Sequence, residues 1–277
     1  MKRGAARVLR WFGLLEAGRR VELRIRMGQP RALPDAVILG AMKSGTSSLH
    51  HYLVQQRDVI EPLRKEVHYF DVNFERGERW YRAHFGRDSE PGLNLDSSPY
   101  YLFHPAVPRR LHDLLPDAKL IVLLRDPVRR AYSHYWHERD KGREILSFED
   151  AIAAEAERLG NSEQRLADGT LERSREHQHF SYLARGRYAE QLDRWLAVFP
   201  REQLLVLKFE DLAREPLEVL NRTLDFLGLP RAASVSLEAR NTRKYPPLGE
   251  TTAARLREYF EPHNQRLEAL LGRPMGW

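Results

Sequence analysis

The 277-residue sequence contains no cysteine. This absence excludes disulfide bonds, thiolate metal sites and a cysteine nucleophile, and it fits a reducing compartment. Long apolar runs are also missing, since no stretch approaches the roughly 18 apolar residues that a membrane-spanning helix needs. With 42% hydrophobic and 30% charged residues, the composition is that of a globular protein with a substantial core. We therefore expect a cytoplasmic protein rather than an integral membrane protein.

Positive charge is concentrated at the amino terminus. The whole chain carries a net charge of +6, from 45 Lys and Arg against 39 Asp and Glu. Residues 1–31 hold nine of these cations and two of the acids, which leaves the remaining chain near −1. A nucleic-acid-binding domain needs a cationic surface on its folded body, so this distribution argues against a nucleic-acid partner.

Residues 1–33 read as a basic amphipathic segment that precedes the main domain, residues 34–277. Apolar residues between positions 8 and 15 recur at helical spacing among arginines. The segment lacks the uninterrupted apolar core of a signal peptide. We expect a helix that packs on its own domain, and contact of residues 1–31 with the inner surface of a membrane is the alternative. Nothing in the sequence indicates the oligomeric state.

Three near-continuous apolar runs predict strands, at Ala36–Leu39, Lys119–Leu124 and Leu204–Phe209. Helical segments separate these runs. Such strands are typical of a parallel sheet covered by helices on both faces, in which ligands bind beyond the carboxyl ends of the strands. The sequence therefore predicts an α/β fold, a P-loop-like three-layer α/β/α architecture with a central parallel sheet.

Helix signals follow two of these strands. One helix is expected over Ser47–Gln55, and another begins with Asp126 as its cap and Pro127 at its first position. A polar, partly helical excursion from the sheet occupies about residues 138–185 and contains a capping sequence that starts at Ser147. The last helix begins near residue 250, and Pro262 should break or kink it.

The loop over residues 40–48, Gly-Ala-Met-Lys-Ser-Gly-Thr-Ser-Ser, joins the first strand to a helix. Its amide N–H groups and the helix dipole favour a phosphate or sulfate group. A nucleoside-triphosphate P-loop requires a lysine directly after its second glycine, where this chain has Thr46. The lysine, Lys43, instead lies inside the loop. An ATP-dependent kinase with Asp126 in the magnesium-binding role is the first alternative function.

This loop resembles the 5′-phosphosulfate loop, G-x-x-K-[ST]-G-T-[ST]-S-L, of the sulfotransferases that use 3′-phosphoadenosine 5′-phosphosulfate (PAPS). The segment Leu124–Tyr135 resembles the 3′-phosphate motif of the same family, with Arg125 at a strand end and Ser133 eight residues later. On a helix capped by Asp126, Ser133 lies two turns in and can face back toward Arg125. A guanidinium and a hydroxyl could then share one phosphate.

Other segments resemble the heparan sulfate N- and 3-O-sulfotransferases within this family. Arg64–Asp71 is similar to their K-E-x-H-[FY]-F-D segment, Arg243–Pro246 to their C-terminal loop, and Gly186-x-Tyr188 to a segment before their last strands. The resemblance covers roughly residues 35–271. The chain departs from that subfamily in lacking its cysteine pair and in reading Asp-Ser-Ser-Pro-Tyr at positions 96–100, where a lysine is usual.

The resemblance implies in-line transfer of the sulfuryl group from PAPS to a hydroxyl or amine of a carbohydrate, glycolipid or hydroxylated small molecule, without a metal. Glu66 would be the catalytic base, with His68 as the second candidate, and Lys43 would stabilise the bridging oxygen of the leaving nucleotide. The implied donor-binding residues are Lys43, Ser44, Gly45, Thr46, Ser47, Ser48, Arg125, Ser133, Tyr188, Arg243 and Lys244. The implied acceptor-binding residues are Lys65, Asp71 and Ser97. A nucleotide-binding scaffold without turnover is the second alternative.

The polar excursion carries two further candidate groups. His177 and His179 have a spacing seen in some metal sites, but no third ligand accompanies them, so we expect solvated loop histidines. The arginines could grip an anionic acceptor such as an acidic glycan, or they could form a solvated charged face. These arginines are Arg173, Arg175, Arg185 and Arg187.

Overall fold

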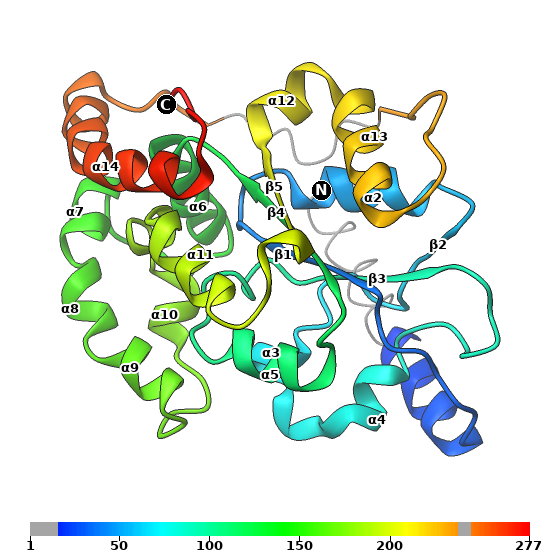
Figure 1. The fold of residues 1–277 in the computed structure, drawn as a ribbon. Coiled ribbons are helices and arrows are strands. Elements are labelled where there is room, and N and C mark those ends of the chain that lie inside the picture. Colours follow the sequence, from blue (N-terminus) through cyan, green and yellow to red (C-terminus); the bar gives the residue numbers. More distant parts are fainter. Residues whose placement is uncertain (1–15, 238–244) are drawn as a thin grey trace, which may run out of the picture.

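The computed structural model describes residues 16–237 and 245–277. A parallel sheet in the order β2-β3-β1-β4-β5 lies at its centre (Figure 1). The strands are β1 (Ala36–Gly40), β2 (Val59–Ile60), β3 (Leu93–Ser97), β4 (Lys119–Leu124) and β5 (Leu204–Lys208). The three predicted strands are confirmed to within one residue at each end, whereas β2 and β3 were not predicted.

Helices fill the connections between the strands. They are α2 (Thr46–Val54), α3 (Tyr69–Val72), α4 (Gly77–Arg82), α5 (Val107–Leu114), α6 (Pro127–Asp140), α7 (Phe148–Ala153), α8 (Glu155–Leu159), α9 (Ser162–Ala167), α10 (Arg175–His179), α11 (Tyr188–Leu196), α12 (Phe209–Arg214), α13 (Pro216–Leu227) and α14 (Glu250–Leu271). Three short 3₁₀ turns accompany them, η1 (Phe74–Arg76), η2 (Ala184–Gly186) and η3 (Arg201–Gln203). The described part of the amino-terminal segment is helical at residues 16–27.

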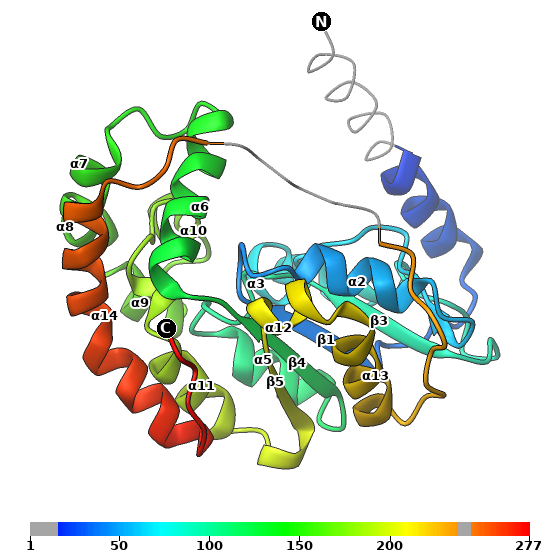
Figure 2. The same cartoon turned by 90° about the horizontal axis from the view of Figure 1, so that it is seen from above.

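Both faces of the sheet are buried. Successive residues of a strand point to opposite faces. In β1, Leu39 belongs to the core cluster shared with α5 and α11, while Ile38 belongs to the cluster shared with α2 and α13. Figure 2 shows α2 and α13 on one side of the sheet, and α5 and α11 on the other. The predicted three-layer α/β arrangement is therefore confirmed.

Strand β3 carries buried polar residues, which is why no apolar run marks it. The Asn94 side chain accepts a hydrogen bond from the Gly86 amide at 2.9 Å. Asp96 is fully buried and accepts from the hydroxyls of Tyr81 at 2.9 Å and Tyr101 at 3.1 Å. Partners that satisfy these groups come from other parts of the chain, so only the tertiary structure makes this strand stable.

Helix α6 begins as the sequence predicts. The Asp126 carboxylate accepts hydrogen bonds from the amides of Val128 and Arg129, and Pro127 occupies the first turn. Ser147 likewise caps α7 by accepting from the Asp150 amide. Asp126 directs α6 away from the carboxyl end of β4, the edge at which the predicted ligand would bind.

The polar excursion folds into a separate layer of short helices beside the sheet. Figure 2 shows α7 and α8 grouped with α14 at one side of the molecule. Their apolar residues form a cluster that includes Tyr135 of α6, Phe148 of α7 and Phe260 of α14. The break expected at Pro262 is not found, because α14 runs through it. Buried Phe260 and Leu267 on either side of the proline hold both halves of the helix in place.

Residues 16–27 pack against the domain through one face of their helix. Val21 is buried in the main core, and the Arg24 guanidinium donates to the main-chain oxygens of Ala83 and Phe85 at 3.0 Å. Residues 16–27 therefore form a helix that packs on the domain. The apolar residues at positions 8–15, on which the prediction of an amphipathic helix rests, lie outside the described residues, so that prediction stays a prediction. No helix in residues 16–237 or 245–277 combines the length and apolar character that crossing a membrane requires.

Candidate functional site

The predicted anion-binding loop leaves the sheet at Gly40 and enters α2 at Thr46. Gly45 occupies the N-cap position of α2, so the cap residue itself offers no side chain to the helix. The Ser48 amide donates to the Gly45 main-chain oxygen at 3.0 Å, and no side chain caps the amides of Thr46 and Ser47 at the end of the helix. The hydroxyl-bearing residues of this turn are Thr46, Ser47 and Ser48, of which Thr46 is buried. These features suit an anion that lies at the helix end.

Both loop glycines are required by close packing. The backbone of Gly45 has a φ of 88°, and a Cβ there would lie 2.8 Å from Cδ2 of Phe209. A Cβ on Gly40 would lie 2.8 Å from the Cβ of Leu102. Side chains at either position would collide with neighbouring elements, so the glycines allow the loop to pack closely against them.

Arg125 connects the second predicted motif to this loop. Its Nη1 donates a hydrogen bond of 3.0 Å to the main-chain oxygen of Lys43. Its guanidinium also lies 4.7 Å from the centre of the Phe209 ring, a cation–π contact. The main-chain oxygen of Arg125 in turn accepts a hydrogen bond of 2.8 Å from the Tyr188 hydroxyl. The fold thus brings Lys43, Arg125 and Tyr188, which are distant in sequence, into one site.

Ser133 and the end of the C-terminal loop are placed by α6. Ser133 is buried on this helix. Next to it, Tyr132 donates a hydrogen bond of 3.0 Å to the main-chain oxygen of Pro246, and Trp136 stacks on Tyr245. The predicted donor residues Arg243 and Lys244 lie outside the described residues.

The segment that contains Glu66 is held at the carboxyl end of β3. The Glu66 amide donates to the main-chain oxygen of Ser97 at 3.0 Å, and the His68 amide donates to the Ser98 hydroxyl at 3.1 Å. Glu66 and His68 both have positive φ angles, 62° and 56°. Strand β3 pairs with β1, with Ser97 opposite Ile38. The segment therefore lies at the same sheet edge as the anion-binding loop.

Charged groups around Glu66 hold it ionised. Lys65 Nζ donates to its carboxylate at 2.8 Å, and His68 Nε2 lies 3.8 Å from its other oxygen. Burial alone would raise the pKa of Glu66, but the His68 interaction and the Lys65 charge outweigh it and lower the pKa well below its usual value.

His68 is held in its protonated form by an acidic neighbour. Its Nδ1 lies 2.7 Å from Oδ2 of Asp71, which is buried. Burial would lower the pKa of His68, but Asp71, followed by Glu66, raises it to about 10. Of the residues expected to contact the acceptor, Asp71 and Ser97 are both buried; Asp71 contacts His68, and the Ser97 main chain contacts Glu66. Both residues thus lie beside the candidate base, and their contact with the acceptor stays a prediction.

Two predictions for the polar excursion were wrong. His177 is fully buried rather than solvated, because its ring stacks on Phe103 and its Nδ1 lies 2.7 Å from the Tyr100 hydroxyl. Arg185 is also buried, and it contacts the Tyr100 ring and the sulfur of Met42 in the anion-binding loop. No local sequence pattern predicted that His177 and Arg185 are buried, since both residues lie in a polar stretch.

The other predicted residues of the excursion lie nearer the surface. The structure places His179 in a partly buried position, 3.5 Å from a Glu138 carboxylate oxygen. Arg173 is exposed and pairs with Glu75 of η1, and Arg187 is partly buried beside Glu190. No group of three His, Asp or Glu side chains in the described ranges is arranged as a metal site.

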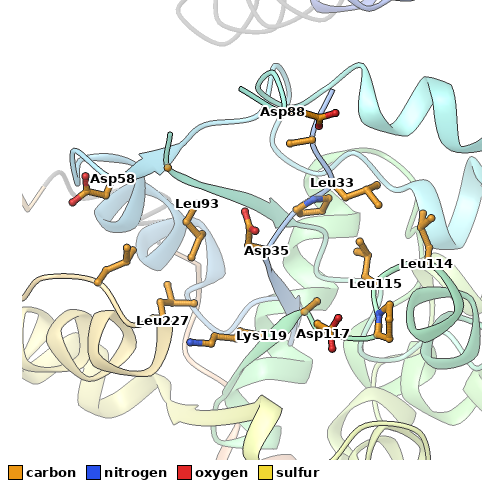
Figure 3. A pocket seen from close by; sticks show the side chains of 16 residues that line it. Leu33, Asp35, Asp58, Asp88, Leu93, Leu114, Leu115, Asp117, Lys119 and Leu227 are labelled. Atoms are coloured by element: carbon orange, nitrogen blue, oxygen red, sulfur yellow. The ribbon is translucent and has the colours of Figure 1, made fainter. Parts of the chain in front are cut away.

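A large cavity lies at the opposite edge of the sheet. It has a volume of about 840 Å³ and is lined by residues at the amino ends of the strands, among them Asp35, Leu93 and Lys119 (Figure 3). Several of its polar groups are already engaged: Asp35 accepts from the Asn94 amide, and Lys119 donates to the Phe226 main-chain oxygen. The described residues that line it include none of the predicted site residues. We therefore locate the candidate site at the carboxyl ends of β1, β3 and β4.

Comparison with known proteins agrees with this geometry. The sulfotransferase domain family matches residues 33–253. Heparan sulfate glucosamine 3-O-sulfotransferase 6 of Homo sapiens is 31% identical over 271 residues, covering 89% of this chain and 74% of its own. The membrane-associated sulfotransferase kil1 of Dictyostelium discoideum is 28% identical over 318 residues, covering 90% of this chain and 68% of its own.

A solved structure gives the same result. The crystal structure of a sulfotransferase from Alicyclobacillus acidocaldarius superposes with a TM-score of 0.72 at 34% sequence identity, over 88% of this chain and 98% of that one. The family match spans β1, the anion-binding loop, β4 and the first part of α14. A chain that matches the family over this range, and shares its architecture with a solved member, belongs to the sulfotransferase family and is an enzyme of that class.

Proposed function

We propose that this sulfotransferase uses PAPS as its sulfuryl donor and transfers the group to a hydroxyl or amine of a carbohydrate. The hydrogen bond between Arg125 and the Lys43 main-chain oxygen carries the proposal, because it joins the two donor motifs into one site. In this site, residues 44–48 hold the 5′-phosphate, while Arg125 and Ser133 hold the 3′-phosphate.

The residues present fit such a donor. Uncapped amides at the start of α2 and the side chains of Lys43 and Arg125 offer positive charge and hydrogen-bond donors to phosphate oxygens. The Nε atom of Arg125 is buried and has no hydrogen-bond partner in the described structure, so it can donate to an anionic ligand. Tyr188 fixes the strand end by donating to the Arg125 main-chain oxygen.

The proposed mechanism is an in-line displacement at sulfur. The acceptor oxygen or nitrogen forms a bond to sulfur while the bond between sulfur and the bridging phosphate oxygen breaks. Glu66 accepts the proton of the acceptor, and Lys43 stabilises the negative charge on the departing bridging oxygen. The nucleotide leaves as adenosine 3′,5′-bisphosphate.

Glu66 suits the role of base better than His68. With a pKa of about 10, the His68 imidazole is protonated at neutral pH and has no free lone pair to accept a proton. Glu66 is ionised, although its low pKa makes it a weak base while Lys65 is bound to it. If Lys65 turns from Glu66 to the acceptor, as its predicted role in acceptor binding implies, the pKa of Glu66 rises, while His68 still holds it below its usual value.

The carbohydrate acceptor is supported by the heparan sulfate glucosamine sulfotransferases among the relatives. Glycolipids and hydroxylated small molecules present the same acceptor groups, and they are tested alongside carbohydrates below. Exposed Arg173 and Arg175 lie on the excursion, where they would favour an anionic acceptor.

The kinase alternative is disfavoured by the family match and by Asp126. The Asp126 carboxylate, which would bind magnesium in a kinase, instead caps α6 by accepting two amide hydrogen bonds. Thr46 also stands where the kinase lysine is required. A nucleotide-binding scaffold without turnover stays an alternative that the transfer assay decides.

We also propose that the enzyme is cytoplasmic and touches the inner membrane surface through the helix at residues 16–27. The helix carries Leu23 and Met27, which are 57% and 53% exposed, and the exposed arginines Arg19 and Arg26. Exposed apolar side chains flanked by cations suit an anionic lipid surface.

The experiment that tests the function is transfer of labelled sulfate from PAPS to panels of glycans, glycolipids and phenols, with products identified by mass. The expected result is a sulfated carbohydrate, formed also in the presence of a metal chelator. Binding of adenosine 3′,5′-bisphosphate without any transfer would support the scaffold alternative. Transfer of phosphate from ATP with magnesium would support a kinase.

A further inference from the structure

Two arginines are buried behind the anion-binding loop, and neither has an ion-pair partner among the described residues. Arg130 on α6 is fully buried and donates from Nη2 to the main-chain oxygen of Tyr182. Its Nε and Nη1 atoms are buried with no hydrogen-bond partner in the described parts of the chain. Arg185 on η2 is 2% exposed and bonds to neutral groups, namely the Ser181 hydroxyl and the main-chain oxygens of His177 and Gln178.

Both arginines lie close to the proposed donor site. Arg185 Nη1 is 3.3 Å from the sulfur of Met42, which directly precedes Lys43 in the loop. Arg130 lies in the first turns of α6, five residues after Arg125, and its bond to Tyr182 joins it to the segment that carries Arg185. Burial and then the positive charges of Arg185 and Arg130 lower the pKa of buried His134, which lies on the same helix as Arg130. Two buried arginines thus lie behind the loop.

The nearby carboxylates are engaged elsewhere. The two oxygens of Glu155 accept hydrogen bonds from the amides of Leu183 and Ala184. Buried Glu138, which also influences Arg185, is bound by Arg143 and lies 3.5 Å from His179. No ion pair joins either carboxylate to Arg130 or Arg185 in the described structure. An unpaired charge inside a protein is costly to the fold. An anion bound at the loop would offset that cost.

We propose that Arg130 and Arg185 form a second layer of positive charge that tightens binding of the phosphate groups of the donor without touching them. The inference rests on the proposed PAPS site and goes beyond it, because it assigns a binding role to residues outside the predicted donor-binding set. They are positioning residues, acting on the ligand through the electrostatic field behind the loop and, for Arg185, through contact with Met42.

If Arg130 and Arg185 act in this way, replacing either one should weaken nucleotide binding without lowering the stability of the unliganded protein. Replacing a buried unpaired charge by an apolar group of similar size usually leaves stability unchanged or raises it. Arg130→Met should therefore weaken binding of adenosine 3′,5′-bisphosphate by about tenfold or more, while the unliganded protein unfolds at the same or higher urea concentration. Arg130→Lys, which keeps the charge, should stay close to the wild-type affinity.

A matched control comes from an arginine that is paired. Arg158 on α8 donates to buried Glu144 at 2.6 Å. Arg158→Met should lower the stability of the unliganded protein, because it leaves Glu144 without this partner, and it should not change nucleotide affinity.

The experiment measures nucleotide affinity by calorimetry and unfolding by urea for the wild type, Arg130→Met, Arg130→Lys, Arg185→Met and Arg158→Met. Unchanged affinity in both Arg130→Met and Arg185→Met would overturn the inference. Failure of Arg130→Met and of the polar neutral Arg130→Gln to fold would also overturn it, since the charge would then serve the fold. A wild-type protein that does not bind the nucleotide would instead refute the proposed donor site.

Discussion

Arg125, at the end of β4, donates a hydrogen bond of 3.0 Å to the main-chain oxygen of Lys43 in the loop after β1. The two residues are 82 positions apart in sequence. They meet because β1 and β4 are neighbouring parallel strands, so the segments that follow both strands emerge at the same edge. A change at Arg125 therefore affects the ligand contact and the loop together.

Arg125→Ala should weaken binding of adenosine 3′,5′-bisphosphate by roughly 10- to 100-fold, because a charged hydrogen-bond donor to phosphate contributes about 1.5–3 kcal/mol. Calorimetric titration measures this effect. Arg129→Ala is the matched control, since Arg129 is exposed on the first turn of α6. Equal affinities in Arg125→Ala and the wild type would rule out the assignment of the 3′-phosphate to Arg125.

Glu66→Gln should lower the turnover of sulfate transfer by about 10²- to 10⁴-fold, because the amide cannot accept the proton of the acceptor. Nucleotide affinity should change little, since Glu66 is proposed to contact the acceptor. Labelled-sulfate transfer and calorimetry on the same protein separate the two effects. Glu78→Gln, at an exposed position of α4, serves as the control. A Glu66→Gln enzyme of normal turnover would exclude Glu66 as the base.

The stability of the unliganded protein should depend on pH through His68. Its pKa is about 10 in the folded protein and near 6.5 when unfolded, so the folded state binds the proton more tightly. The resulting stabilisation is complete below about pH 6.5 and is lost as the pH rises through about 10. Urea unfolding between pH 6 and pH 10 should show this loss in the wild type.

Asp71→Asn tests the cause of that pH dependence. Removal of the carboxylate beside Nδ1 should lower the pKa of His68, so stability should vary less between pH 6 and pH 10. The same slope in Asp71→Asn and the wild type would show that another group is responsible. Nuclear magnetic resonance of the His68 ring measures its pKa directly in both proteins.

Gly45→Ala should destabilise the protein by about 1–3 kcal/mol and abolish measurable nucleotide binding, because the new Cβ combines a positive φ with a collision against Phe209. Gly169→Ala is the matched control. Gly169 also has a positive φ, 77°, but none of the described atoms lies within 4 Å of the position that a Cβ would occupy there. Similar losses in both variants would mean that φ alone, rather than the Phe209 contact, sets the cost.

Leu23→Ser together with Met27→Ser should reduce binding to vesicles that contain phosphatidylserine, because both apolar side chains are exposed beside arginines. Co-sedimentation with vesicles measures the effect, and pure phosphatidylcholine vesicles should bind weakly. Ile145→Ser is the control, since Ile145 is 79% exposed on the excursion. Wild-type protein that does not sediment with anionic vesicles would refute the membrane contact.

Features that depend on residues close together in the chain could be predicted from the sequence. Apolar runs identified β1, β4 and β5, since a strand buried on both faces needs continuous apolar side chains. The Asp126 cap and Pro127 placed the start of α6 because both act within one turn. The loop over residues 40–48 was recognisable because its glycines and Lys43 are close in sequence.

Features that depend on partners far away in the chain could not be predicted from the sequence. Strand β3 is stable because Tyr81 and Tyr101 satisfy buried Asp96, and no local pattern indicates those contacts. His177 and Arg185 looked solvated in a polar stretch, yet packing against Phe103 and Tyr100 buries them. The cost of burying a polar or charged group depends on what surrounds it in space, which a short stretch of sequence does not specify.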